Sequence, residues 1–135
     1  MPVGIPPDLD PQPIWWKLVL GVALAGAVGT LARFGLAKVF GDHLGTLLAN
    51  TLGCLLFGLI LAWVEAKLHA NHTLRVVLLT GFMGAFTTFS TYAYLSTHLL
   101  REGQWFSAAG HILAHNILGI ALFMVGLALG GRLVA

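Results

Sequence analysis

Charged residues are scarce in this sequence. Asp, Glu, Lys and Arg together make up 9% of the 135 residues, whereas hydrophobic residues make up 58%. In a soluble domain about a quarter to a third of the surface residues are charged. The composition therefore excludes a water-soluble protein and predicts an integral membrane protein. Cysteine is almost absent as well. Cys54 stands alone in an apolar run, which excludes a disulfide framework and is typical of a small packing residue.

Acidic residues are missing from the middle of every long apolar run. All five lie outside these runs or at their edges: Asp8, Asp10, Asp42, Glu65 and Glu102. Transporters driven by protons or cations usually need a carboxylate at mid-membrane, so the distribution argues against a carboxylate-based pump. The seven basic residues are scattered, make no nucleic-acid patch and are typical of membrane-edge anchors.

Four apolar segments predict an all-α fold of four transmembrane helices. Each has the ~20 residues that a spanning helix needs, and they cover about residues 15–36, 44–64, 76–100 and 107–131. All five prolines precede residue 14, in a stretch without the basic start or apolar core of a signal peptide. We expect residues 1–14 to be a disordered tail and residues 15–135 to be a single transmembrane domain.

Basic residues are almost evenly divided between the two sides of such a bundle. Four would lie on the side of the termini and three on the other, namely Lys17, Lys67, Arg75 and Arg132 against Arg33, Lys38 and Arg101. Because an excess of Lys and Arg normally fixes orientation, this balance is either sampling noise or a sign of insertion both ways round. The second reading predicts two copies that pair antiparallel.

The third segment contains an unusual stretch, residues 81–92. Within twelve positions it has two glycines and four hydroxyl residues between aromatic ones. Glycines weaken a helix, and irregular backbone at membrane depth is tolerated only where it is buried in protein or lines a cavity. We therefore expect a broken third helix. The alternative is a seam of small and hydroxyl residues that only packs helices together.

Three kinds of side chain near this stretch are candidate anion contacts. Asn50 is an amide inside the second segment and must be hydrogen-bonded, either to a neighbouring helix or to an anion. Phe89 and Tyr92 are three residues apart, and aromatic ring edges are electron-poor. Thr88 and Thr91 repeat that spacing and supply hydroxyl donors. Donors and ring edges without a central cation would suit a hard, strongly hydrated monovalent anion.

The six histidines carry a weaker signal. His111 and His115 have the i, i+4 spacing of a two-ligand metal face, but two ligands without a carboxylate or thiol are a poor indication of a metal. We favour hydrogen-bonded or wetted positions for this pair. The other four fall at loops or segment ends and are expected to be solvated: His43, His69, His72 and His98.

Over nearly all of residues 20–131 the chain resembles the Fluc/CrcB fluoride channel family. Three local matches carry the resemblance: GTLARF at 29–34, GTLLANTLG at 45–53 and GFMGAFTTFST at 81–91. The resemblance implies a fluoride channel of the cell (inner) membrane, not an enzyme, that exports fluoride passively. It also implies an antiparallel, dual-topology homodimer with two pores.

The resemblance also assigns residues. Asn50 would be the pore amide, with Phe89 and Tyr92 as ring-edge contacts. The backbone carbonyls of Gly84 and Thr87 would hold a structural Na⁺ at the dimer centre. At the end of the first span, Arg33 could raise the local anion concentration.

Three positions depart from the family pattern. Tyr92 stands where Phe is usual, Leu95 where many relatives carry a glutamate, and His111 where Tyr is frequent. Two other functions stay open at this point. A small multidrug transporter would need a glutamate in the first span, which is absent. A non-transporting assembly subunit would use its small and hydroxyl residues only to pack helices together.

Overall fold

The computed structural model describes residues 15–67 and 71–134. The expected N-terminal tail and His69 lie outside the described residues. These residues form helices and contain no strand, in the order α1 (Trp15–Phe40), α2 (Asp42–Lys67), α3 (His72–Val76), the π-helix η1 (Val77–Met83), α4 (Gly84–Phe86), α5 (Phe89–Arg101) and α6 (Trp105–Val134). The all-α prediction is confirmed.

Within residues 15–67 and 71–134, four helical stretches are long and apolar enough to cross a membrane: Trp15–Phe40, Asp42–Lys67, His72–Arg101 and Trp105–Val134. The prediction of a multi-pass membrane protein is confirmed. Each stretch is longer than its predicted apolar segment. The connection expected at 37–43 is reduced to Gly41, whose φ of 80° favours a residue without a side chain. Gly103, with φ 73°, has the same role in the turn before α6.

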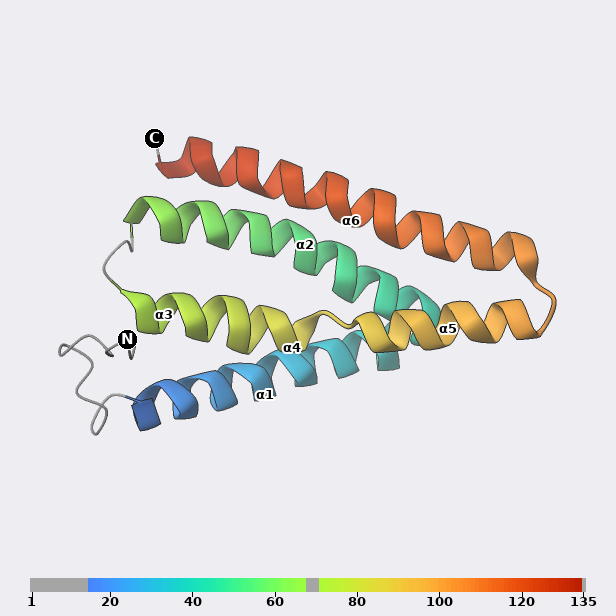
Figure 1. Cartoon of the computed structure of the whole chain (residues 1–135), viewed down its shortest axis with the longest axis horizontal. Helices are drawn as coiled ribbons and strands as arrows, with labels where there is room; N and C mark the ends of the chain where they lie inside the picture. Colours follow the sequence, from blue (N-terminus) through green and yellow to red (C-terminus); the bar gives the residue numbers. More distant parts are fainter. Residues whose placement is uncertain (1–14, 68–70, 135) are drawn as a thin grey trace, which may run out of the picture.

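The helices run side by side along the long axis of the molecule (Figure 1). α2 packs along α6, and α1 packs along η1 and α4. Small residues allow both approaches. A Cβ on Gly126 would contact the Leu55 carbonyl of α2, and one on Gly81 would lie 3.1 Å from the Ala25 side chain of α1. The hydrophobic effect does not drive helices together in lipid, so van der Waals contacts between closely packed backbones supply much of the attraction.

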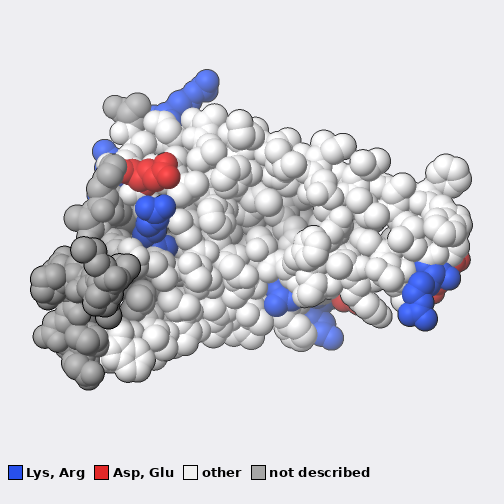
Figure 2. All heavy atoms as spheres, viewed as in Figure 1, with Lys and Arg blue, Asp and Glu red and all other residues white. Residues whose placement is uncertain are grey.

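Charged side chains leave much of the surface free. In the face shown in Figure 2, Lys, Arg, Asp and Glu lie at the two ends and along the lower edge, and the upper part between the ends carries none. Large apolar side chains are exposed along the helices, among them Leu24 and Ile120. This distribution matches helices that face hydrocarbon.

The α2–α6 interface gives a test of this packing. We expect Gly126→Ala to destabilise the protein by about 1–3 kcal/mol. Its Cβ would also lie 3.0 Å from the Leu59 nitrogen, a backbone atom that cannot move aside without shifting α2. Gly110→Ala is the matched control on α6, since nothing lies within 4 Å of its Cβ position. Thermal unfolding in detergent measures both. Equal melting temperatures for the two variants would contradict the packing described here.

Candidate functional site

The third span loses its helical backbone at Thr87 and Thr88. α4 ends at Phe86 and α5 begins at Phe89. Between them Thr87 (φ −86°, ψ 157°) and Thr88 (φ −148°, ψ 116°) are extended, and Figure 1 shows this connection between α4 and α5. The Thr87 N–H still donates to the Met83 carbonyl at 3.2 Å, but the extended backbone at Thr88 cannot continue the i to i−4 hydrogen bonds of the helix. Its polar groups therefore need partners from elsewhere in the protein.

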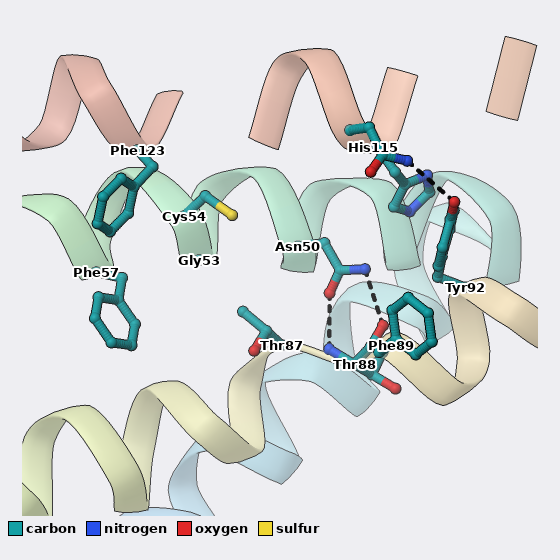
Figure 3. A pocket seen from close by; sticks show the side chains of 11 residues that line it. Asn50, Gly53, Cys54, Phe57, Thr87, Thr88, Phe89, Tyr92, His115 and Phe123 are labelled. Carbon is teal, nitrogen blue, oxygen red and sulfur yellow. Dashed lines mark hydrogen bonds between the residues drawn. The ribbon is translucent and has the colours of Figure 1, made fainter. Parts of the chain in front are cut away.

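Asn50 supplies these partners from α2. Its Nδ2 donates to the Thr88 carbonyl at 2.9 Å, and its Oδ1 accepts from the Thr88 N–H at 2.7 Å. Figure 3 shows both bonds from one amide to one residue. Gly53, one turn along α2, leaves room for the break, because a Cβ there would contact the Thr87 methyl group. Of the two partners considered for Asn50, the structure shows a neighbouring segment of the same chain.

The break leaves two backbone carbonyls without their usual helical donors, and the Asn50 bond accounts for one of them. In a helix the Gly84 carbonyl would accept from the Thr88 N–H, which donates to Asn50 instead. The Thr87 carbonyl would accept from the Thr91 N–H, which donates at 3.2 Å to the Thr88 hydroxyl that caps α5. Both carbonyls thus lose their regular helical donors, so they are available as oxygen ligands.

The hydroxyl groups of the break bind mainly one another. Thr88 Oγ1 donates to Thr91 Oγ1 at 3.1 Å and lies 3.3 Å from Ser90 Oγ. Thr87 Oγ1 donates back to the Met83 carbonyl at 3.1 Å. Thr88 lines the pocket described next, whereas Thr91 is not among its lining residues.

A pocket of about 370 Å³ opens beside the break. The predicted residues Asn50, Phe89 and Tyr92 meet there, and the two rings lie 5.4 Å apart at 54°. Other lining residues come from α2 and α6 and were not predicted as pore residues: Gly53, Cys54, Phe57, His115, Asn116 and Phe123. Among the described lining residues there is no Asp, Glu, Lys or Arg. The surroundings suit a small solute held by amide donors and ring edges.

Arg33 lies apart from this pocket. Its Nε donates to the Ala85 carbonyl at 3.2 Å, next to the break, and it is not among the pocket residues. The bond fixes the guanidinium against α4. A role in concentrating anions stays a prediction.

A cluster of polar rings borders the pocket on the side of α6. Tyr92 lies 4.7 Å from the His115 ring and 5.7 Å from the His111 ring, and its hydroxyl accepts from Asn116 Nδ2 at 3.1 Å. His43 is exposed, as expected, but its ring also lies edge-on to His111 at 5.4 Å. Within the described residues no group of three His, Cys, Asp or Glu side chains could hold a metal ion.

A family model describing the CrcB-like protein, Camphor Resistance (CrcB), matches residues 20–127. The chain belongs to the CrcB family. Relatives match along nearly their whole length. A protein of Nitratidesulfovibrio vulgaris is 48% identical over 87% of this chain and 98% of its own, and one of Nitrosococcus oceani is 42% identical over 82% and 94%. A protein of Aquifex aeolicus is 41% identical over 86% and 98%. Each bears the name fluoride-specific ion channel FluC.

Membership of the CrcB family confirms the resemblance found in the three sequence motifs. The matched range contains all of the pocket residues and the whole break. The structural features described above are thus features of a CrcB chain and not of an appended segment.

Proposed function

We propose that this chain forms a fluoride-selective channel through which fluoride leaves the cytoplasm passively. Membership of the CrcB family and the shared name of the three relatives support fluoride as the ion. A channel needs no coupled energy, which agrees with the absence of carboxylates from the described pocket lining. This function is ion transport and not catalysis.

The main support for this proposal is the break in the third span at Thr87 and Thr88, which two hydrogen bonds with Asn50 hold in place. Asn50 holds Thr88 in an extended conformation, and this places Phe89 and Tyr92 on the pocket wall. Fluoride would pass along the ring edges, the Asn50 amide and the Thr88 hydroxyl, with the Thr91 hydroxyl behind them as the partner of Thr88. These neutral groups replace part of the water that fluoride loses in the pore, and they do not bind it as tightly as a full positive charge would. The charge of Arg33, close to the break, would raise the local anion concentration.

A second copy of the chain would complete the pore. Phe89 is 77% exposed, and Gly84 and Ser90 beside it are exposed as well, although all three lie in the interior of a membrane span. Irregular polar backbone does not face lipid. We propose that an inverted copy covers this surface in an antiparallel homodimer with two pores, as the even division of Lys and Arg also suggests.

A structural Na⁺ at the dimer centre would fit the residues present. Gly84 and Thr87 offer carbonyl oxygens whose helical donors are engaged elsewhere, and hard oxygen ligands suit a hard cation. Two carbonyls from each of two inverted chains would make the ligand set. The bound charge would compensate carbonyl groups that lipid cannot hydrate.

This arrangement predicts a mild effect of Thr87→Val. The backbone carbonyl and a methyl group stay in place, and only the hydroxyl bond to Met83 is lost. A neutral hydrogen bond contributes about 1 kcal/mol, so we expect fluoride flux within about fivefold of the wild-type value. Flux measured with external Na⁺ replaced by a large organic cation shows whether the ion site is intact. A loss as complete as that expected for Asn50 variants would assign the role to the hydroxyl.

Fluoride efflux from liposomes tests the function itself. Purified protein is reconstituted with internal KF, a potassium ionophore starts the efflux, and a fluoride electrode records it. We expect rapid fluoride release and no comparable release of chloride. Release of neither ion would favour a non-transporting assembly subunit, and release only with a proton gradient would favour a coupled transporter.

A further inference from the structure

An ionisable pair that the proposed function does not use lies on α6 at the border of the pocket. His115 is only 8% exposed and lines the pocket together with Asn50, Phe89 and Tyr92. His111 lies one turn away on α6, and the two ring centroids are 4.3 Å apart. Figure 3 shows the His115 ring beside Tyr92, on the α6 side of the pocket.

Hydrogen bonds fix which nitrogen of each neutral ring carries the proton. His115 Nδ1 is 3.0 Å from the His111 carbonyl, which can only accept, so this Nδ1 donates. The Ser96 hydroxyl donates to the Tyr92 carbonyl at 2.7 Å, so its oxygen is left to accept from His111 Nδ1 at 3.1 Å. In both neutral rings the lone pair therefore resides on Nε2.

Both lone pairs are buried without a donor. Neither Nε2 has a hydrogen-bond partner in the part of the chain that the structure describes. A buried acceptor without a donor is unfavourable, and native proteins rarely leave one without a reason. A proton taken up at Nε2 removes the bare lone pair and adds a positive charge, which then needs a counter-ion.

The described residues that line the pocket offer that charge no acidic partner. The titratable groups that face the pair are His43 and Cys54 from α2 and Tyr92 from α5, and the described pocket lining contains no Asp or Glu. The Tyr92 ring, whose centroid is 4.7 Å from that of His115, can stabilise the charge through a cation–π interaction. Its edge then becomes more electropositive, which is the edge proposed to meet fluoride.

We propose that His111 and His115 form a proton-linked anion site, at which one proton taken up by the pair raises the affinity of the adjacent pocket for fluoride. The inference rests on the proposed fluoride function and deepens it. The proton comes from water and binds Nε2, and no covalent bond to fluoride forms. Because linkage is reciprocal, fluoride must raise the proton affinity of the pair by the same factor. Acid conditions, in which fluoride enters cells as HF, would then favour fluoride binding in the exit path.

Flux at two pH values tests the site. Proteoliposome efflux is measured at about pH 8 and about pH 6, which bracket imidazole titration, and the rate of protein-free liposomes is subtracted at each pH because HF crosses lipid. In the wild type we expect the half-saturating fluoride concentration to fall by at least about fivefold on acidification, the lower end of typical coupling. The same shift in the double variant His111→Gln/His115→Gln, or no shift in the wild type, overturns the proposal.

A matched control and a direct measurement complete the test. His98→Gln alters an exposed histidine that faces Glu102 at 3.5 Å, and it should keep the full shift. NMR titration of labelled histidines in the unaltered protein should show that NaF, but not NaCl, raises the protonation midpoint of two of them. Unchanged midpoints overturn the inference even if a variant misfolds. Absence of fluoride flux from the wild type at both pH values contradicts the proposed function itself.

Discussion

Asn50→Asp is expected to abolish fluoride flux. The carboxylate would keep the bond from the Thr88 N–H but would lose the Nδ2 donor to the Thr88 carbonyl, at 2.9 Å in the wild type. It would also place a negative charge on the wall of the pocket. Two like charges in near contact repel by about 4 kcal/mol at an effective dielectric constant of 20, which corresponds to roughly a thousandfold lower rate.

A neighbouring substitution separates this effect from general damage to α2. Thr51 is buried next to Asn50, but among the described residues its hydroxyl bonds only within α2, to the Leu47 carbonyl at 2.7 Å and the Leu48 carbonyl at 3.5 Å. Thr51→Val should retain flux within a few-fold, since one neutral hydrogen bond is worth about 1 kcal/mol. Liposome efflux at matched protein density measures both variants. Wild-type flux in Asn50→Asp would show that the hydrogen-bonded pair of Asn50 and Thr88 is not part of the ion path.

Phe89→Ile is the second large effect that we expect. The substitution keeps an apolar side chain of similar width and removes the ring edge, so a dehydrated anion loses an electropositive contact. We expect flux to fall by about a hundredfold or more, which corresponds to about 3 kcal/mol. Folding should be little affected, because Phe89 is 77% exposed in the single chain and contributes little to its core.

Tyr94→Ile on the same helix is the matched control. Tyr94 is also aromatic and 65% exposed, but it does not line the pocket and its ring lies 6.0 Å from His98. It should conduct fluoride like the wild type in the same efflux assay. An equal loss in both variants would indicate a defect in membrane insertion or pairing, whereas no loss in either would exclude Phe89 from the pore.

The sequence was enough to predict the four-span membrane fold. Lipid requires each crossing segment to be long, apolar and hydrogen-bonded within itself, so uncharged runs identify the helices. The ends were less well predicted, because a helix continues into polar residues until something stops it. The first span was predicted to end at residue 36, but α1 continues to Phe40. It ends there because Gly41 has a positive φ, which departs from helical geometry.

Candidate residues could be named from the sequence, but their partners could not. Asn50 and Thr88 were both identified, yet their two hydrogen bonds join residues 38 positions apart. No local pattern encodes such a pairing, which depends on how α2 packs against the third span. For the same reason the edge-on contact of His43 with His111 and the place of His115 in the pocket could not be derived.

The π-helix η1 is a further feature without a sequence signal. It occupies Val77–Met83 directly before α4. π-helical turns are rare and occur mainly at functional sites, and here the segment leads into the break. Gly81 within it approaches Val22 and Ala25 of α1, each 3.1 Å from its Cβ position. The wider turn thus belongs to the packing that positions Thr87 and Thr88.

The side of the membrane on which the C-terminus lies decides whether an antiparallel pair can form, because an inverted second copy requires chains of both orientations. A single cysteine placed after residue 135, in a Cys54→Ala background, is labelled in intact cells with a thiol reagent that cannot cross the membrane. We expect about half of the chains to be labelled, because the even division of Lys and Arg fixes no orientation. Labelling of all chains, or of none until the cells are lysed, would contradict the pairing of the Asn50-clamped break with an inverted copy.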